Sequence, residues 1–353
     1  MFGYFKWSFV SVLVGLVLAF WRGHEIGASG MMFAFTALSI SILEIAISFD
    51  NAVVNAVKLR RMSDEWRHRF LTWGILIAVF GMRFIFPILI VSIFAQIPSF
   101  KVLDLAIHNP TEYVEHLHHA NPGIVSFGGM FLLMLFLKFF IDPKKDVHWI
   151  VPVEKFIQKL ARIKFIVEIL GLSVLGALLL ALPHDYRLFC GVSGFVGIIL
   201  FLGIDGIAHC LERHNKDVGE GVRLSGKAGF AAFMYLELID ASFSLDGVLG
   251  AFAFSNDVVV IAVGLGVGAM FVRSLTIMLV ERKALEKLLY LTSGAYWAIG
   301  ALSFIMLFSA LREVPEAIAA TVSAMFIVLS LISSLRLNKR LEKAGIEHCE
   351  RVD

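Results

Sequence analysis

Ten long apolar runs, each bounded by charged residues, constrain this chain more than any other feature of its sequence. They lie at about 7–21, 31–57, 70–95, 124–141, 165–182, 187–210, 228–254, 257–280, 289–311 and 316–335. An α-helix needs about 20 apolar residues to cross the hydrocarbon core of a bilayer. The sequence therefore predicts an all-α polytopic membrane protein with about ten transmembrane helices. The first run closes at Trp21-Arg22 without a small-residue cleavage site, which favours a retained span over a signal peptide.

The basic residues between the runs indicate the orientation. If the chain alternates from a cytoplasmic N-terminus, 24 of the 31 Lys and Arg residues fall in inner segments and four in outer segments. This is the positive-inside pattern, so both termini are expected on the cytoplasmic side of the inner (plasma) membrane. The segment 152–164 alternates Lys and Arg with apolar residues and predicts a helix along the inner membrane surface.

Composition excludes several classes of function. The net charge of +2, without a basic patch, argues against nucleic acid as a partner and leaves membrane lipid as the expected surroundings. Two of the three cysteines, Cys190 and Cys210, lie about 30 Å apart on one predicted helix, and Cys349 lies in the tail. Neither a disulfide framework nor a cysteine-based zinc site is available. The oligomeric state stays open.

Two parts of the sequence share one pattern of polar residues. The matching positions are Glu44, Ser48, Asp50, Gly74 and Arg83 in the first copy and Asp240, Ser244, Asp246, Gly264 and Arg273 in the second. Spans 2–4 (31–141) therefore correspond to spans 7–9 (228–311). Five spans separate the two starts, so the copies are expected to run in opposite directions. Inverted repeats with polar residues at matching depths are typical of transporters whose site lies between the repeats.

One membrane domain is expected to contain both repeats. The segment 142–227 would hold the inner-surface helix, two inserted spans and a cytoplasmic loop, and 312–353 the last span and a cytoplasmic tail.

Helix geometry groups most of the polar side chains into stripes. At about 100° per residue, Glu44, Ser48, Asn51 and Asn55 lie on one face of span 2, and Glu237, Asp240 and Ser244 on one face of span 7. Asp50 and Asp246 fall about 120° away from these faces. A break in each helix, at Asp50-Asn51 and at Asp246-Gly247, would bring them back, and Asn and Gly tolerate such backbone.

This arrangement predicts a metal site at mid-membrane. Five carboxylates, Glu44, Asp50, Glu237, Asp240 and Asp246, are expected at this depth. With them lie the amide and hydroxyl oxygens of Asn51, Asn55, Ser48 and Ser244 and the side chains of Arg83 and Arg273. A surplus of carboxylate and amide oxygens suits Mn²⁺, Ca²⁺ or Mg²⁺ rather than a thiophilic metal. The two arginines are expected to pair with Asp50 and Asp246 when no metal is bound.

The stretches "LEIAISFDNAVV" and "ELIDASFSLDGVLGAFAFSND" resemble the paired motifs of the TerC family, integral membrane proteins of the LysE-type transporter superfamily. The resemblance covers about 31–141 and 228–311. It implies an inverted three-helix repeat, export of a divalent metal with manganese above all, and metal binding by the acids and Asn51 of the two motifs. Gly247-Val248-Leu249 departs from the family pattern after the last Asp, which indicates a divergent subfamily.

The leading hypothesis is therefore a secondary transporter, not an enzyme, with a divalent metal as substrate, protons as the exchanged ion and no resident cofactor. Two alternatives stay open: an intramembrane aspartyl protease and a LysE-like exporter of small organic solutes. The predicted outer loop 101–123, with four His residues, is either a solvated loop or a place that captures metal. Lys138 is expected to extend to the inner surface, and Asp205 and His209 form either a proton relay or a structural pair.

Overall fold

The computed structural model describes residues 2–214, 224–252, 254–255, 257–282, 284–312 and 314–343, and they are almost entirely helical. The elements are α1 (Phe2–Glu25), α2 (Gly30–Ile47), α3 (Phe49–Leu59), α4 (Asp64–Leu76), the π-helix η1 (Ile77–Ile85), α5 (Phe86–Ala95), α6 (Ser99–His108), α7 (Pro110–Ile141), α8 (Val151–Lys159), the 3₁₀-helix η2 (Leu160–Arg162), α9 (Ile166–Ala181), α10 (His184–His214), α11 (Gly226–Phe252), α12 (Val258–Glu281), α13 (Ala284–Lys287), α14 (Leu291–Ser309) and α15 (Glu316–Lys343). The all-α expectation is confirmed.

Seven of these helices are long and apolar enough to cross a membrane, so the chain is a polytopic membrane protein. Of the ten predicted spans, 70–95 is divided among α4, η1 and α5, and 165–182 corresponds to the 16-residue α9. The chain bends by 108° between α8–η2 and α9, and these helices would give an eighth span if they were counted together. This bend agrees with a surface helix that leads into a span. The total of ten stays a prediction.

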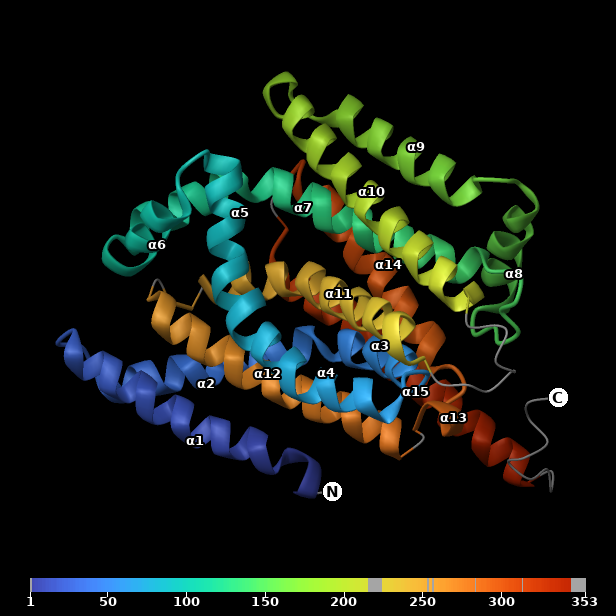
Figure 1. The fold of residues 1–353 in the computed structure, drawn as a ribbon, viewed down its shortest axis with the longest axis horizontal. Helices are drawn as coiled ribbons and strands as arrows, with labels where there is room; N and C mark the ends of the chain where they lie inside the picture. Colours follow the sequence, from blue (N-terminus) through green and yellow to red (C-terminus); the bar gives the residue numbers. More distant parts are fainter. Residues whose placement is uncertain are drawn as a thin grey trace.

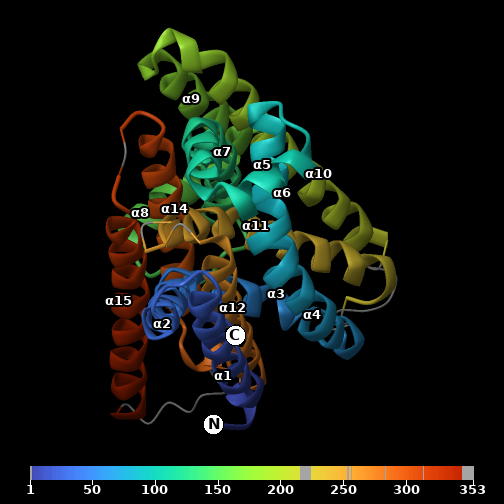
Figure 2. The same ribbon diagram turned by 90° about the vertical axis from the view of Figure 1, so that its left-hand side faces the viewer.

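The helices pack as a row of layers. Figure 1 shows α1, α2 and α12 side by side at one edge and α9 and α10 at the opposite edge, with α7, α11 and α14 between them. In the turned view α15 runs along one side of the bundle, against α14 and α2 (Figure 2). Local signals set the helix ends: Ser29 accepts a hydrogen bond from the Met32 amide, and Asp257 does the same for Val260.

The two predicted repeats pack across each other. α2 and α3 lie along α12, whereas α11 lies against α4, η1 and α5. The third helices repeat this exchange, because α14 contacts α3 and α7 contacts α11. Each first helix thus contacts the second and third helices of the other repeat, which is the packing expected of an inverted pair.

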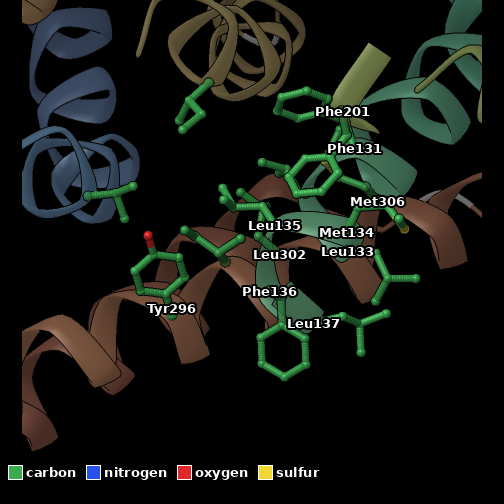
Figure 3. Close-up of a cluster of buried hydrophobic side chains, with 14 of the residues drawn as sticks. Phe131, Leu133, Met134, Leu135, Phe136, Leu137, Phe201, Tyr296, Leu302 and Met306 are labelled. Atoms are coloured by element: carbon green, nitrogen blue, oxygen red, sulfur yellow. The ribbon is translucent and has the colours of Figure 1, made fainter. Parts of the chain in front are cut away.

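The largest apolar core joins α7 to α10 and α14. Phe131 and Phe201 meet edge to face with ring centroids 5.7 Å apart, and Phe139 stacks on Tyr296. Figure 3 shows this cluster around the consecutive residues 133–137 of α7. Lipid is as apolar as these side chains, so close packing rather than transfer from water holds the helices together here.

Segments expected on the same side of the membrane meet each other. Residues 61–63 and Leu224, from two predicted inner segments, exchange backbone hydrogen bonds of 2.8 and 2.9 Å. Asn338 donates to the Lys287 carbonyl, which joins two further inner segments. Arg22 and Asp257, both predicted outside, form an ion pair of 3.0 Å. These contacts agree with the predicted alternation.

The predicted outer loop 101–123 is helical. The segment forms most of α6 and the first turns of α7. Its buried side chains are Val102, Ala106, Tyr113, Leu117 and Ala120. The reading of this segment as a solvated loop is therefore wrong. Most of the predicted cytoplasmic segment 213–227 and the end of the tail, 344–353, lie outside the described residues.

Candidate cation site between the two halves

The polar residues of both motifs meet in the interior of the bundle, on α2, α3, η1, α11 and α12. Their exposed fractions range from 0 to 4%. The buried members are Glu44, Ser48, Asp50, Asn51, Asn55, Arg83, Glu237, Asp240 and Arg273. Ionised groups at this depth are costly unless they are paired, so their contacts decide what the cluster can do.

Span 2 is broken at Ser48. Its φ and ψ of −90° and 15° end α2, and α3 begins at the next residue. The Ser48 hydroxyl donates a hydrogen bond of 2.9 Å to Glu44 Oε1, and the backbone N–H of Asn51 donates one of 2.8 Å to Asp50 Oδ1. The predicted break therefore exists in this span, two residues before the predicted position. It starts a new helix that brings Asp50 and Asn51 into the interior.

Span 7 has no such break. α11 is continuous from Gly226 to Phe252, through Asp246 and Gly247, so the second predicted break is wrong. The side chains of Ser244 and Asp246 lie outside the described residues, and their predicted roles stay predictions.

Arg83 reaches the cluster from the π-helix η1. Its Nη2 forms an ion pair with Glu44, and its Nη1 donates a 2.7 Å hydrogen bond to the Ala78 carbonyl of its own helix. The same Nη1 lies 3.7 Å from Asp240 Oδ2. The carboxylates that the structure places against Arg83 are therefore those of Glu44 and Asp240, two acids that were not its predicted partners. Its pairing with Asp50 stays a prediction.

Arg273 enters from α12 and is held more firmly. Its Nη2 donates to both carboxylate oxygens of Glu237, at 3.1 and 3.2 Å, and lies 3.4 Å from Asp240 Oδ2. Its Nη1 donates to the Phe70 carbonyl at 3.3 Å, and the guanidinium lies over the Phe70 ring, 3.9 Å from the centroid. Neither the ring nor the carbonyl of Phe70 was predicted from the sequence.

Asp240 connects the two halves. Its Oδ1 accepts a hydrogen bond of 2.5 Å from Asn51 Nδ2, while its Oδ2 faces both arginines. Under the alignment of the motifs, the pair of Arg83 with Glu44 corresponds to that of Arg273 with Asp240. One charged contact thus recurs at matching positions of the two motifs.

Glycines let the helices approach at these charges. A Cβ at Gly268 would lie 2.5 Å from the Glu44 Cβ, and one at Gly74 would lie 2.5 Å from Arg273 Nη1. A Cβ at Gly247 would lie 2.5 Å from Glu44 Oε2. The backbone of the opposite half therefore comes directly against the charged groups, and water has little room beside them.

Two buried amide oxygens in this cluster accept no hydrogen bond from the described residues. They are Oδ1 of Asn51 and Oδ1 of Asn55, whose residues are 0 and 2% exposed. The acids also outnumber the arginines. Among the described residues, four buried acids, Glu44, Asp50, Glu237 and Asp240, lie in the cluster together with two arginines, so these six side chains carry a net charge of −2 when all are ionised.

The described carboxylates are arranged around guanidinium groups. Each arginine contacts two carboxylates, and in the described part of the chain no three acid, His or Cys side chains are placed to hold one metal ion together. The side chain of Asp246 lies outside this described part. Four of the six predicted ligands, Glu44, Asn51, Glu237 and Asp240, thus share one network, and Asp50 lies beside it through its hydrogen bond with Asn51.

Other predicted polar features lie apart from this cluster. Lys138 forms an ion pair with Asp205, whose side chain is 26% exposed, so Lys138 has a local partner in addition to its expected reach toward the surface. The side chain of His209 lies outside the described residues. His108 pairs with Asp104 in an exposed i, i+4 contact.

A buried ion pair that sequence reasoning missed lies at the C-terminal end of α7. Glu154 of α8 is 1% exposed and accepts hydrogen bonds from Lys145, from the Trp149 and Ile150 amides, and from Trp297 Nε1 at 3.0 Å. Nothing in the spacing of these residues indicates that α14 would supply a partner.

Comparison with known proteins places the chain in a family without assigning an activity. A family model described as "Protein of unknown function (DUF475)" matches residues 49–341, a range that begins just after Glu44 and Ser48 and includes the other residues of the cluster. No curated protein and no solved structure matches the chain. The match covers well over half of the sequence, and the chain therefore belongs to the DUF475 family of proteins of unknown function.

Proposed function

We propose that this protein is a secondary transporter that exports a divalent metal cation, with Mn²⁺ as the preferred cargo, through the acidic cluster between its two halves. The observation that carries the proposal is the excess of buried oxygen. The described residues of the cluster include four buried acids and two arginines, and the Oδ1 atoms of Asn51 and Asn55 accept no hydrogen bond from the described residues. A buried acceptor without a donor is costly, and a cation or its water shell would satisfy it.

The donor set supports a hard divalent cation. Carboxylate and amide oxygens are the ligands of Mn²⁺, Ca²⁺ and Mg²⁺, whereas metals such as Cu⁺ prefer thiolate or thioether sulfur. Two excess negative charges match one divalent cation. The resemblance of both motifs to the TerC family implies the same cargo, which is why Mn²⁺ is proposed first.

The position of the cluster supports transport rather than a structural site. It lies where the first helix of each half crosses the second helix of the other, so a movement between the halves would change the ligands that surround a bound ion. We propose protons as the exchanged ion, because neighbouring carboxylates titrate as a coupled group. The contacts given for Asp240 are with an amide and two guanidiniums, which differs from the proton-sharing Asp pair of an aspartyl protease.

Cellular metal content tests this function. Cells that express the wild type in excess Mn²⁺ should hold less Mn than cells without it. Asp50→Asn and Asp240→Asn should lower efflux by about tenfold or more, since each removes a buried ligand charge. Asp185→Asn is the matched control, because Asp185 is an exposed acid in the first turn of α10.

Efflux at the wild-type rate in both site variants would reject the proposal. Cleavage of a membrane protein substrate that is independent of metal and is lost in the same two variants would instead favour a protease. Wild-type cells with unchanged Mn, Ca and Mg but altered content of a small organic solute would favour the organic exporter.

A further inference from the structure

We infer that Arg83 is an exchangeable internal cation: its guanidinium occupies the carboxylates of Glu44 and Asp240 while no metal is bound, and leaves them when the metal enters. This inference rests on the proposed function and concerns how the empty site is reset. The two arginines, which occupy matching positions in the sequence, are assigned different roles, because their surroundings differ.

Arg83 contacts both halves of the molecule. One of its carboxylate partners, Glu44, lies on α2 in the first repeat, and the other, Asp240, lies on α11 in the second. Arg273 contacts two acids of a single helix, Glu237 and Asp240 of α11. Phe70 of the first repeat also contacts Arg273, but both carboxylates that bind Arg273 lie on one helix. A movement between the halves would therefore separate the two carboxylates that Arg83 bridges, whereas those of Arg273 would move together.

Arg83 is also held by fewer contacts. It makes two hydrogen bonds, to Glu44 and to the Ala78 carbonyl of its own helix, and its second carboxylate, Asp240, lies 3.7 Å away. Its Nε is buried and has no hydrogen-bond partner among the described residues. Arg273 makes four hydrogen bonds and lies on the ring of Phe70. The guanidinium that costs less to displace is that of Arg83.

The helix that carries Arg83 can change its register. η1 is a π-helix of nine residues, whereas Arg273 lies in the regular α-helix α12. π-helical turns are rare and recur at functional sites. Moving from π to α geometry in η1 would rotate Arg83 about the helix axis and remove it from both carboxylates.

The Arg83 guanidinium would compete with the metal for the two carboxylates and would neutralise them after the metal has left. Without Arg83, the metal should bind more tightly, because one competitor is gone. The empty site would then return across the membrane with uncompensated buried charge, which is costly. Exchange of metal for metal never requires an empty site to return, so it should persist while net transport falls.

Purified protein in liposomes separates these two activities. We expect Arg83→Gln to keep exchange of radioactive Mn²⁺ against Mn²⁺ and to lower net Mn²⁺ flux about tenfold, with a half-saturating Mn²⁺ concentration at least about threefold lower than in the wild type. Added guanidinium should restore part of the net flux. Arg273→Gln is the matched comparison and should lose exchange and net flux together, because Arg273 holds the framework.

Three results would overturn the inference: equal loss of both fluxes in Arg83→Gln, a higher half-saturating concentration, or wild-type behaviour. If Arg83→Gln does not fold, Arg83→Lys decides in its place. Its ammonium pairs more weakly with the two carboxylates, so a lower half-saturating concentration and a lower ratio of net flux to exchange are expected. A wild type without any Mn²⁺ exchange would refute the proposed function itself, which distinguishes the two failures.

Discussion

At the scale of single residues, the cluster depends on side chains that are small enough to admit charged neighbours. Gly268 of α12 is the tightest example. A Cβ there would lie 2.5 and 2.6 Å from the Cβ and Cγ of Glu44 and 3.0 Å from the Ser41 carbonyl. Because a backbone atom is among these neighbours, rotation of one side chain cannot relieve the overlap.

Gly268→Ala should therefore destabilise the protein by about 1–3 kcal/mol, the usual cost of overpacking, and should reduce efflux because Glu44 is displaced. Gly176→Ala is the matched control, since Gly176 is exposed on α9 with nothing within 4 Å of its added Cβ. It should stabilise its helix by about 0.5–1 kcal/mol. Thermal unfolding in detergent measures both, and equal melting temperatures for the two variants would contradict the packing argument.

Most residues of the cluster were predicted from the sequence, whereas their pairing was not. The acid–Ser–Asp motif and the Gly–Arg spacing located Glu44, Asp240 and both arginines. Arg83 nevertheless pairs with Glu44 and lies near Asp240, neither of which was its predicted partner, because side-chain partners depend on how the helices cross and on the local backbone. The π-helical turns around Arg83 have no recognisable sequence signature.

At the scale of elements, α8 is fastened to the bundle by one buried acid. Burial raises the pKa of Glu154, but the hydrogen bonds from Lys145, Trp297 and the Ile150 amide outweigh it, so the pKa lies below its ordinary value. Burial lowers the pKa of Lys145, and Glu154 compensates part of this effect. The Glu154 carboxylate thus accepts hydrogen bonds from the buried Lys145 ammonium, from the backbone amides at the start of α8 and from the Trp297 indole.

The stability that Glu154 contributes should depend on acid pH. A lowered pKa in the folded state means that the contribution is complete above the unfolded pKa, about 4.3, and is lost as pH falls through the lower folded value. At neutral pH, Glu154→Gln should cost about 3–5 kcal/mol, because Lys145 stays buried without its counter-charge.

The matched control for this prediction is Glu65→Gln, which breaks an exposed i, i+4 pair with Arg69 and should cost less than about 1 kcal/mol. Melting temperatures from pH 7 to pH 3 measure the difference. A constant gap between the wild type and Glu154→Gln over that range would refute the assignment.

Element boundaries show where sequence patterns were sufficient and where they failed. The misfit of Asp50 on an ideal helix correctly indicated a break in span 2. The same argument failed for Asp246, because α11 continues through Gly247. The segment 101–123 was predicted as a loop because of its many polar residues. Its apolar residues nevertheless have helical spacing: Val102 and Ala106 are four residues apart, and Tyr113, Leu117 and Ala120 are four and three apart.

At the scale of the whole molecule, the crossed packing makes each half depend on the other. α2 and α3 bury their surfaces on α12 and α14, and α11 buries its surface on η1, α4 and α7. Orientation signals in the sequence agree with contacts between loops on the same side, because charge placement acts on whole segments. The contacts between halves involve residues that are far apart in sequence, and only the duplicated motif predicted them.

Dividing the chain between residues 218 and 219 tests this dependence. Fragments 1–218 and 219–353 should be recovered as a complex when they are expressed together, whereas each fragment alone should be degraded or aggregate, because its first helix lacks its partners. Copurification through a tag on one fragment, followed by size-exclusion chromatography, measures the outcome. A stable, monodisperse fragment 1–218 on its own would contradict the crossed arrangement.

The same exchange of helices bears on how such a chain could have arisen. A single three-helix unit with the faces of α2, η1 and α7 would leave its first helix uncovered, because the covering surfaces belong to a second unit of opposite orientation. Before gene duplication, one product would have needed to insert both ways up and assemble with inverted copies of itself. Fusion of two such genes would fix one orientation for each copy and would let Arg83 and Arg273 differ in their surroundings.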